Sequence, residues 1–279
     1  LQGQPLSKEE LSLYRTCVGI LLYMSTERPD IQCVRQLASK VTGPDTLDQK
    51  GLKLLALYLK HTADYVQEMK QSFAMASAMG ERSDDVKMAA TQHPSRLEVF
   101  TDSDWASDRT TRRSMSRSHM YLNGIFFWSA SRSQKSIALS SCEAEFISAV
   151  SGMADGIYIK RMLEAVLNMK VVLELRIDSS SARALLQRQG VQRTRHISTG
   201  LLWVQQKVEE REAAIRPAPG KENSSDLGTK SHSSKRLRFL LGLIGYLEFA
   251  GGPRVGAQEE EIRHVKGLRP ERVQQLICL

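Results

Sequence analysis

The spacing of hydrophobic residues changes at Arg96, and this change divides the chain into a helical part and a mixed part. Before Arg96, apolar residues recur every three or four positions, which predicts helices at residues 14–22, 31–41 and 46–61. After Arg96, short alternating or β-branched runs predict strands at residues 97–100, 118–122, 125–128, 136–139 and 171–177. The sequence therefore predicts an α/β domain that follows a helical segment.

The dipeptide Asn123-Gly124 separates two of these apolar runs. Asn-Gly readily takes the backbone angles of a two-residue hairpin turn, so the two strands are expected to pair antiparallel. Downstream of the hairpin, helical spacing predicts further helices at residues 141–167, 181–187, 199–212 and 224–247, with a short strand at 213–218. Residues 69–94 show no firm periodicity and are interpreted as a connection.

Composition limits the function classes. With 279 residues, of which 41% are hydrophobic, the chain is long enough to fold around one large or two modest cores. The 39 Lys and Arg residues exceed the 31 Asp and Glu residues, which favours a polyanionic partner without identifying it. The four cysteines are far apart, which argues against a zinc site and against a disulfide framework. No apolar run approaches the roughly 20 residues of a membrane-spanning helix, and Leu1 begins no basic-then-apolar leader. We expect a soluble fragment or processed product.

Four acidic residues fall at the ends of predicted elements. Asp102 and Asp178 lie at the carboxyl ends of two strands, Glu145 lies one turn into the long helix, and Asp226 begins the last predicted helix. Ligands bind at the carboxyl ends of strands in open α/β sheets, so the four acids are expected to converge on one site. Each acid alone also fits a helix cap, a turn or an exposed position.

A cluster of carboxylates is costly to keep ionised unless a cation neutralises it. Hard oxygen ligands suit Mg²⁺ or Mn²⁺, and two such ions about 4 Å apart activate water and stabilise the leaving oxygen in phosphodiester hydrolysis. A basic surface would hold the phosphates of the substrate. If the carboxyl groups were more than about 8 Å apart, two-metal chemistry would be implausible.

Several motifs then occur in one consistent order: TDSDWASD at 101–108, RRS at 112–114, a segment from Trp128 to SSCEAEF at 140–146, and RTRHI at 193–197. With this order and spacing, the chain resembles the ribonuclease H region of copia-type retrotransposon Pol polyproteins. The stretch from Tyr14 to Ile31 and YLKHT at 58–62 resemble the segment that joins the reverse transcriptase to that region.

The resemblance implies an α/β, ribonuclease H-like fold with a mixed five-stranded sheet flanked by helices. It is preceded by a helical segment from the reverse transcriptase thumb and connection. The domain boundaries that follow are a helical remnant at 1–65, a linker at 66–94, the ribonuclease H-like domain at 95–250 and a charged, flexible tail at 251–279.

The resemblance also assigns roles. It implies four metal ligands that bind two Mg²⁺ or Mn²⁺ ions, namely Asp102, Glu145, Asp178 and Asp226. The neighbouring acids Asp104 and Glu143 rank lower. Substrate contacts are expected from Ser103, Arg112, Arg113, Arg195 and His196.

The implied activity is hydrolysis of the RNA strand of an RNA–DNA hybrid, with the rest of the Pol polyprotein as a partner. We expect no membrane partner. We also expect no small-molecule substrate, because no Gly-rich phosphate loop follows a strand. The implied location is inside the cell, in a cytoplasmic virus-like particle or in the nucleus. The Asp84-Asp85 pair lacks the apolar strands of a polymerase hairpin, so no DNA synthesis is expected.

The chain departs from the family pattern in several places. Ser114-Met115-Ser116-Arg117 stands where many relatives have Ser-Thr-Ser-Gly, which removes a glycine and adds a charge. Ser179 follows Asp178 where Asn is usual, and Ser225 precedes Asp226 where Ala is common. The alternative hypothesis is therefore a catalytically silent or domesticated nucleic-acid-binding module.

Overall fold

The computed structural model describes residues 3–69, 94–108, 110–168, 170–188, 198–227, 229 and 232–248. These residues belong to two compact units. The first unit comprises Leu1–Glu68, Ala130–Ser133 and the part of the chain that starts at Leu227, and the second comprises Met69–Ser129 and Gln134–Asp226.

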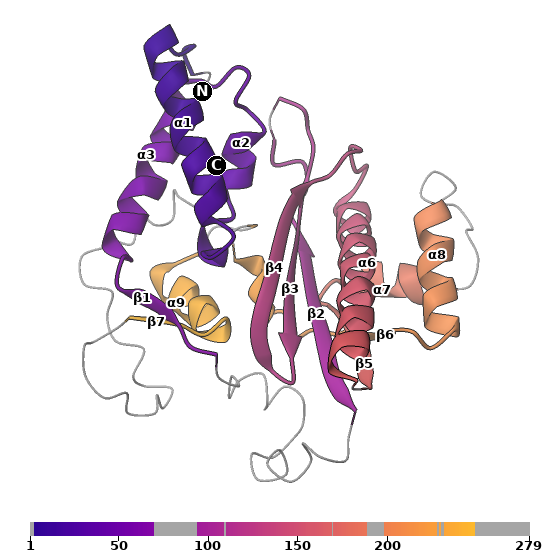
Figure 1. Ribbon diagram of the computed structural model, residues 1–279. Helices are drawn as coiled ribbons and strands as arrows, with labels where there is room; N and C mark the ends of the chain where they lie inside the picture. Colours follow the sequence, from indigo (N-terminus) through magenta and orange to yellow (C-terminus); the bar gives the residue numbers. More distant parts are fainter. Residues whose placement is uncertain are drawn as a thin grey trace. The chain divides into compact units, whose positions relative to one another are not determined.

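The first unit contains the N-terminal helices and a two-stranded sheet (Figure 1). Its elements are α1 (Lys8–Met24), η1 (Pro29–Ile31), α2 (Val34–Ala38), α3 (Thr46–His61), β1 (Tyr65–Gln67), α9 (Ser234–Leu243) and β7 (Tyr246–Glu248). Ser7 and Asp45 cap α1 and α3, and each forms a capping box with the acid three residues later. Strand β7 pairs antiparallel with β1, although about 180 residues separate them in sequence.

A buried ion pair stabilises this unit. The Arg28 guanidinium contacts the Asp30 carboxylate at 2.7 Å, and the Tyr58 hydroxyl donates a hydrogen bond to the same carboxylate at 2.8 Å. The Tyr246 hydroxyl donates to the Glu27 carbonyl at 2.7 Å. Residues 234–248 therefore belong to the same unit as the N-terminal helices, whereas the sequence-based boundary assigned them to a domain of residues 95–250.

The second unit is built on a five-stranded mixed sheet. The strands of this sheet are β2 (Ser95–Ser103), β3 (Met115–Leu122), β4 (Ile125–Ser133), β5 (Val171–Ile177) and β6 (Ala214–Pro217), in the order β4-β3-β2-β5-β6. The last four residues of β4 are grouped with the first unit. Strand β2 runs antiparallel to β3 and parallel to β5, and β5 runs parallel to β6. The helices are α6 (Ser141–Leu167), α7 (Ser180–Gln187) and α8 (Ser198–Glu209), and the short η3 turn covers Ser224–Asp226. The predicted fold class is confirmed.

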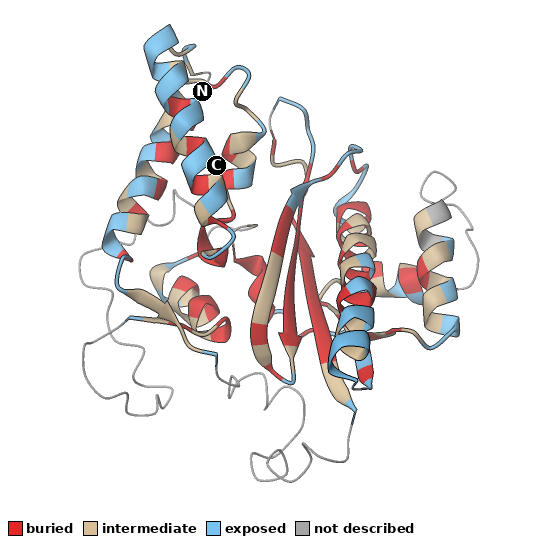
Figure 2. Ribbon diagram, in the orientation of Figure 1, coloured by how far each residue is buried: buried red, intermediate tan, exposed pale blue. Residues whose placement is uncertain are grey.

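Helix α6 covers one face of this sheet. Strands β2 and β3 are buried over most of their length (Figure 2). Leu97 and Val99 of β2 and Met120 of β3 join the apolar core beneath α6. Gly152 and Gly156 of α6 let the helix approach the strands closely, because a Cβ atom at Gly156 would lie 2.9 Å from Val99 Cγ2 and from Leu173 Cδ1.

The alternate residues of β2 and β3 form a second, mixed core on the opposite face. Phe100, Tyr121, His119 and Phe126 pack edge to face, with ring centroids 5.2–5.4 Å apart. The hydroxyl of Ser224 in η3 contacts His119 Nδ1 at 3.0 Å and accepts a hydrogen bond from the Tyr121 hydroxyl at 2.6 Å. The η3 turn therefore packs on the face of the sheet that α6 does not cover.

Several predicted elements agree with the structure and others do not. The helices predicted at 46–61 and 141–167 are present, and Asn123 and Gly124 form the hairpin turn with positive φ angles of 51° and 79°. The predicted strand at 136–139 is wrong: this segment is irregular, and Ile137 and Leu139 are 54% and 72% exposed. The single helix predicted at 224–247 is also wrong.

That segment forms η3, α9 and β7 instead. Ser233 begins α9 by accepting a hydrogen bond from the Arg236 N–H, and Gly245, at a φ of 75°, follows the end of the helix. The helix predicted at 31–41 is reduced to η1 and the five-residue α2. Across the described part of the chain, no helix has both the length and the apolar character needed to cross a bilayer.

The close packing of α6 yields a stability prediction. In Gly152→Ala, the new methyl group would overlap Thr101 Cγ2, so we expect the free energy of unfolding to fall by about 1–3 kcal/mol. The three tryptophans all lie in the second unit, so urea unfolding followed by tryptophan fluorescence reports on that unit.

Gly200→Ala is the matched control. A Cβ atom at Gly200 in α8 would meet only ordinary contacts, the nearest 3.5 Å away, and alanine favours helices by up to about 1 kcal/mol over glycine. This variant should be as stable as the parent or more stable. A Gly152→Ala protein as stable as Gly200→Ala would contradict the proposed contact between α6 and β2.

Candidate metal centre

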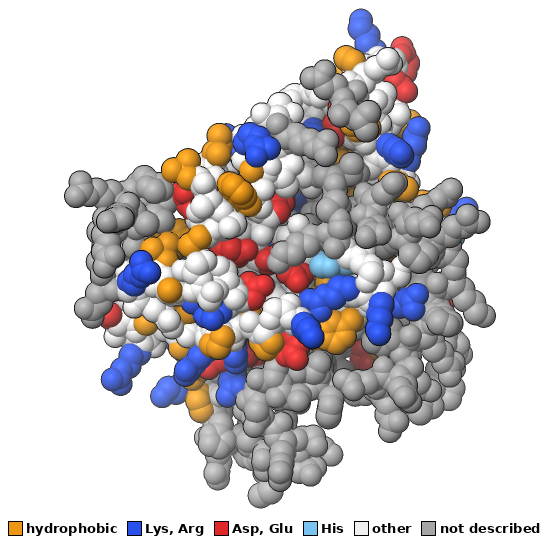
Figure 3. All heavy atoms as spheres, turned by 180° about the vertical axis from the view of Figure 1, so that it is seen from behind, with side chains coloured by type: hydrophobic (Ala, Val, Ile, Leu, Met, Phe, Trp, Pro, Cys, Tyr) orange, Lys and Arg blue, Asp and Glu red, His pale blue; other side chains and the backbone are white. Residues whose placement is uncertain are grey.

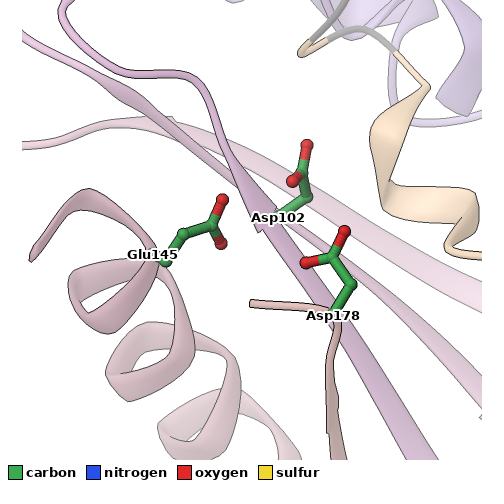
Figure 4. A group of neighbouring side chains, drawn as sticks. All are labelled: Asp102, Glu145 and Asp178. Carbon is green, nitrogen blue, oxygen red and sulfur yellow. The ribbon is translucent and has the colours of Figure 1, made fainter. Parts of the chain in front are cut away.

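Three of the predicted acidic residues converge at the carboxyl end of the central strands. Asp102 lies near the end of β2 and is buried, Glu145 lies one turn into α6, and Asp178 directly follows β5. One carboxylate oxygen from each residue lies within 4.8 Å of those of the other two. Figure 4 shows the three side chains, which come from different elements and point toward one another.

Strand register explains why two of these acids are neighbours. Thr101 of β2 is paired with Ile177 of β5 in a parallel ladder, so Asp102 and Asp178, one residue further along each chain, lie side by side. Arg183 of α7 holds the backbone at Asp178, because its Nη1 atom donates to the Ile177 and Asp178 carbonyls at 2.6 and 3.1 Å.

Helix α6 supplies the third acid. Ser140 begins the helix by accepting a hydrogen bond from the Glu143 N–H at 3.2 Å. About one turn beyond Glu145, the Ser148 hydroxyl donates to the Asp102 carbonyl at 2.8 Å, which holds α6 against β2. The Ser103 N–H donates to Glu145 Oε1 at 3.4 Å, so the backbone of β2 orients the Glu145 carboxylate.

The fourth predicted ligand, Asp226, is placed differently. It lies in η3, is 6% exposed, and is not in the group of three carboxylates. The Asn223 side chain donates to the Thr101 carbonyl at 3.1 Å, which ties the start of η3 to the residue before Asp102. Asp226 therefore lies on an element anchored to the strand that carries Asp102, and its role as a ligand stays a prediction.

Neighbouring acids have structural partners. Asp104 Oδ1 accepts a hydrogen bond from the Met115 N–H at 2.7 Å, and burial raises the pKa of Asp104. Glu143 Oε2 accepts from the Leu139 N–H at 2.9 Å. For Asp178, the capping alternative does not apply, because Ser179 caps α7. These contacts distinguish the structural acids from the converging ones.

The residues predicted to contact substrate are only partly described. Arg112 and Arg113 are exposed in the turn between β2 and β3, and Ser103 is buried at the end of β2. The Asp108 carboxylate shapes that turn by accepting hydrogen bonds from the Thr110 and Thr111 N–H groups. Arg195 and His196 lie outside the described residues.

The sequence reasoning identified Arg117 as an added charge near the hairpin but did not place it beside the converging acids. Arg117 is 1% exposed and is paired in register with Asp102. The sequence signal was available, because Arg117 is the only Lys, Arg, Asp or Glu residue of this strand. Figure 3 shows acidic side chains gathered on one face of the molecule, with Lys and Arg side chains around them.

The sequence of the chain is similar to those of several known proteins. No family model matches the chain. The chain is 26% identical over 237 residues to the retrovirus-related Pol polyprotein from transposon TNT 1-94 of Nicotiana tabacum, which corresponds to 83% of this chain. It is also 28% identical over 135 residues to an uncharacterized mitochondrial protein of Arabidopsis thaliana.

Over most of its length, the chain is thus similar to a retrotransposon Pol polyprotein. It spans only 16% of the length of the tobacco Pol polyprotein and 48% of the length of the Arabidopsis protein. A secreted RxLR effector protein of Plasmopara viticola is 28% identical over 148 residues, which cover 52% of this chain and 90% of the effector.

Solved ribonuclease H structures are similar at a low level. The N-terminal RNase H domain of a Mycobacterium tuberculosis protein has a TM-score of 0.35 and 8% identity, with 46% of this chain and 86% of that chain covered. LC11-RNase H1 in complex with an RNA/DNA hybrid has a TM-score of 0.33 and 15% identity, with 46% and 88% covered.

The mixed core on the face of the sheet opposite α6 generates a pH prediction. Burial, and then the charge of Arg117, lower the pKa of His119 far below its usual value of about 6.5. The unfolded chain therefore binds a proton near pH 6.5 that the folded unit does not bind until a much lower pH. Its free energy of unfolding should fall as the pH drops below about 6.5, by up to about 1.4 kcal/mol per pH unit.

The measurement is urea unfolding followed by tryptophan fluorescence between pH 7.5 and 5. His119→Gln cannot gain this proton, so its stability should depend less steeply on pH. His61→Gln replaces an exposed histidine of the first unit and should keep the parent slope. Equal slopes for His119→Gln and the parent would contradict the prediction.

Proposed function

We propose that this chain is a metal-dependent ribonuclease H that hydrolyses the RNA strand of an RNA–DNA hybrid as part of a copia-type Pol polyprotein. The observation that carries the proposal is the convergence of Asp102, Glu145 and Asp178 within 4.8 Å at the carboxyl ends of β2 and β5. Their distance is well below the 8 Å at which two-metal chemistry would become implausible. The relationship to a Pol polyprotein supports the same assignment.

The donor set fits a hard divalent cation. Three carboxylates at this separation repel one another when ionised. Oxygen ligands of this kind favour a hard cation such as Mg²⁺ or Mn²⁺. Asp102, Glu145 and Asp178 would hold the metal, and Asp226 would complete the site from η3. When bound, one or two such ions would activate water and stabilise the leaving oxygen of a phosphodiester.

The protein's own residues orient this site. The Ser103 N–H and the Ser148 hydroxyl hold Glu145 and the backbone of Asp102 in fixed positions, so the carboxylates need little reorganisation when a cation binds. The exposed Arg112 and Arg113 would contact substrate phosphates from the turn between β2 and β3. Recognition would depend on the shape of the hybrid and on its 2′-hydroxyl groups rather than on base sequence.

A second candidate function is a catalytically silent module that binds nucleic acid through the same fold. One observation favours it: a buried guanidinium, that of Arg117, is paired in register with Asp102. A silent module would bind hybrid without cleaving it, and removal of the acids would leave that binding unchanged.

The test is cleavage of a labelled RNA–DNA hybrid by the purified chain in Mg²⁺. Asp102→Asn and Glu145→Gln should each lower the rate about a hundredfold or more, because several kcal/mol of transition-state stabilisation depend on the metal. Chelation of the metal with EDTA should abolish cleavage of the RNA strand.

Glu209→Gln is the matched control, since it also neutralises a helical carboxylate but at an exposed position of α8. It should cleave at the parent rate. If the parent and Asp102→Asn bind hybrid equally and neither cleaves it, the silent module is the better description. Equal cleavage by the parent and Asp102→Asn would exclude Asp102 from the active site.

A further inference from the structure

Arg117 is a buried cation beside the metal centre. It is 1% exposed and is among the largest fully buried side chains of the described residues. Arginine stays protonated in proteins, so the side chain brings a full positive charge into the interior. Such a charge is costly to bury without anionic groups close by.

Strand register places this charge next to Asp102. Asp102 and Arg117 are directly opposed in the antiparallel β2–β3 ladder, so their Cβ atoms are about 5 Å apart and both side chains leave the sheet on the same face. Asp178 flanks Asp102 on the other side, because β5 is the opposite neighbour of β2. In the sheet, Asp102 therefore lies between an acidic residue and a basic residue.

The face they share is the one that η3 covers. The preceding pair, Thr101 and Ser118, approaches Gly152 of α6, and side chains alternate along each strand. His119 and Tyr121, which leave β3 on the same face as Arg117, contact Ser224 of η3. Arg117 thus lies on the face that also carries the turn containing Asp226.

A guanidinium and a divalent cation have opposing requirements at this place. Each stabilises ionised carboxylates, and each repels the other at short range. Burial strengthens both effects, since the effective dielectric constant is lower than in water. A bound ion would therefore gain less from these acids than from the same acids without Arg117.

We propose that Arg117 acts as a built-in competitor of the divalent cation: it neutralises the acids of the metal-free protein and weakens their affinity for metal. The proposal rests on the proposed function only in taking Asp102, Glu145 and Asp178 as the metal ligands. It makes the site's occupancy, and hence any activity, dependent on a high concentration of divalent cation.

The test is Mn²⁺ binding to the full chain, measured without nucleic acid by water-proton relaxation. Arg117→Met keeps much of the side-chain volume and removes the charge, and it should bind Mn²⁺ at least about tenfold more tightly than the parent. Arg117→Lys keeps a positive charge and should bind Mn²⁺ as weakly as the parent.

Arg161→Met is the control for a general loss of positive charge. Arg161 is exposed on α6 and pairs with Glu212, about 24 Å along the helix from Glu145, and its replacement should leave Mn²⁺ affinity unchanged. Folded Arg117→Met protein with the parent's affinity would overturn the proposal. So would an equal gain in Arg161→Met.

If Arg117→Met is unfolded without metal, circular dichroism with and without Mg²⁺ decides. Recovery of the folded spectrum in Mg²⁺ supports the proposal, because the ion replaces the lost charge. A variant that stays unfolded in Mg²⁺ while Arg117→Lys folds overturns it.

The outcome is separable from hybrid cleavage. If the parent does not cleave hybrid but Arg117→Met binds Mn²⁺ more tightly, the competitor role holds and the proposed activity fails. If the parent cleaves hybrid and Arg117→Met gains no affinity, only the competitor role fails.

Discussion

The parallel pairing of β2 with β5 is the constraint on which the rest of the second unit depends. It brings Asp102 and Asp178 to the same edge of the sheet, and α6 adds Glu145 from one side. Like charges at this distance destabilise the fold, so the surrounding structure has to hold them in place. The hydrogen bonds of the Ser103 N–H and the Ser148 hydroxyl do so without adding charge, and the Arg183 guanidinium holds the backbone of Ile177 and Asp178.

Neutralisation of that cluster has two possible sources, and they compete. One is a divalent cation, which carries the chemistry of phosphodiester hydrolysis. The other is the buried guanidinium of Arg117, which stabilises ionised acids but cannot activate a water molecule as a metal ion does. A protein that relies on the second source is stable without metal and binds metal weakly. The same side chain therefore links the stability of the second unit to its proposed activity.

Local patterns predicted much of this unit because each depends on short-range chemistry. The hairpin at Asn123-Gly124 and the helix 141–167 follow from turn angles and helical spacing. The strand predicted at 136–139 failed because its alternation reflected no partner strand, and Ile137 and Leu139 are exposed. Pairings between distant segments, such as β1 with β7, leave no local signal, so the domain boundary near residue 227 was not predictable.

Local patterns also predicted some residues of the candidate site and not others. The three converging acids were predictable because each ends or begins an element at the same edge of a sheet, whereas Asp226 depended on a helix that does not form. Its position follows instead from η3, which Asn223 ties to Thr101 and Ser224 ties to β3. Arg117 leaves the sheet on the face that this turn covers. A cation shared between Asp102 and Asp226 would therefore have to bind on the face that Arg117 already occupies. The charge of Arg117 would then oppose binding of a cation at Asp226 as well as at Asp102.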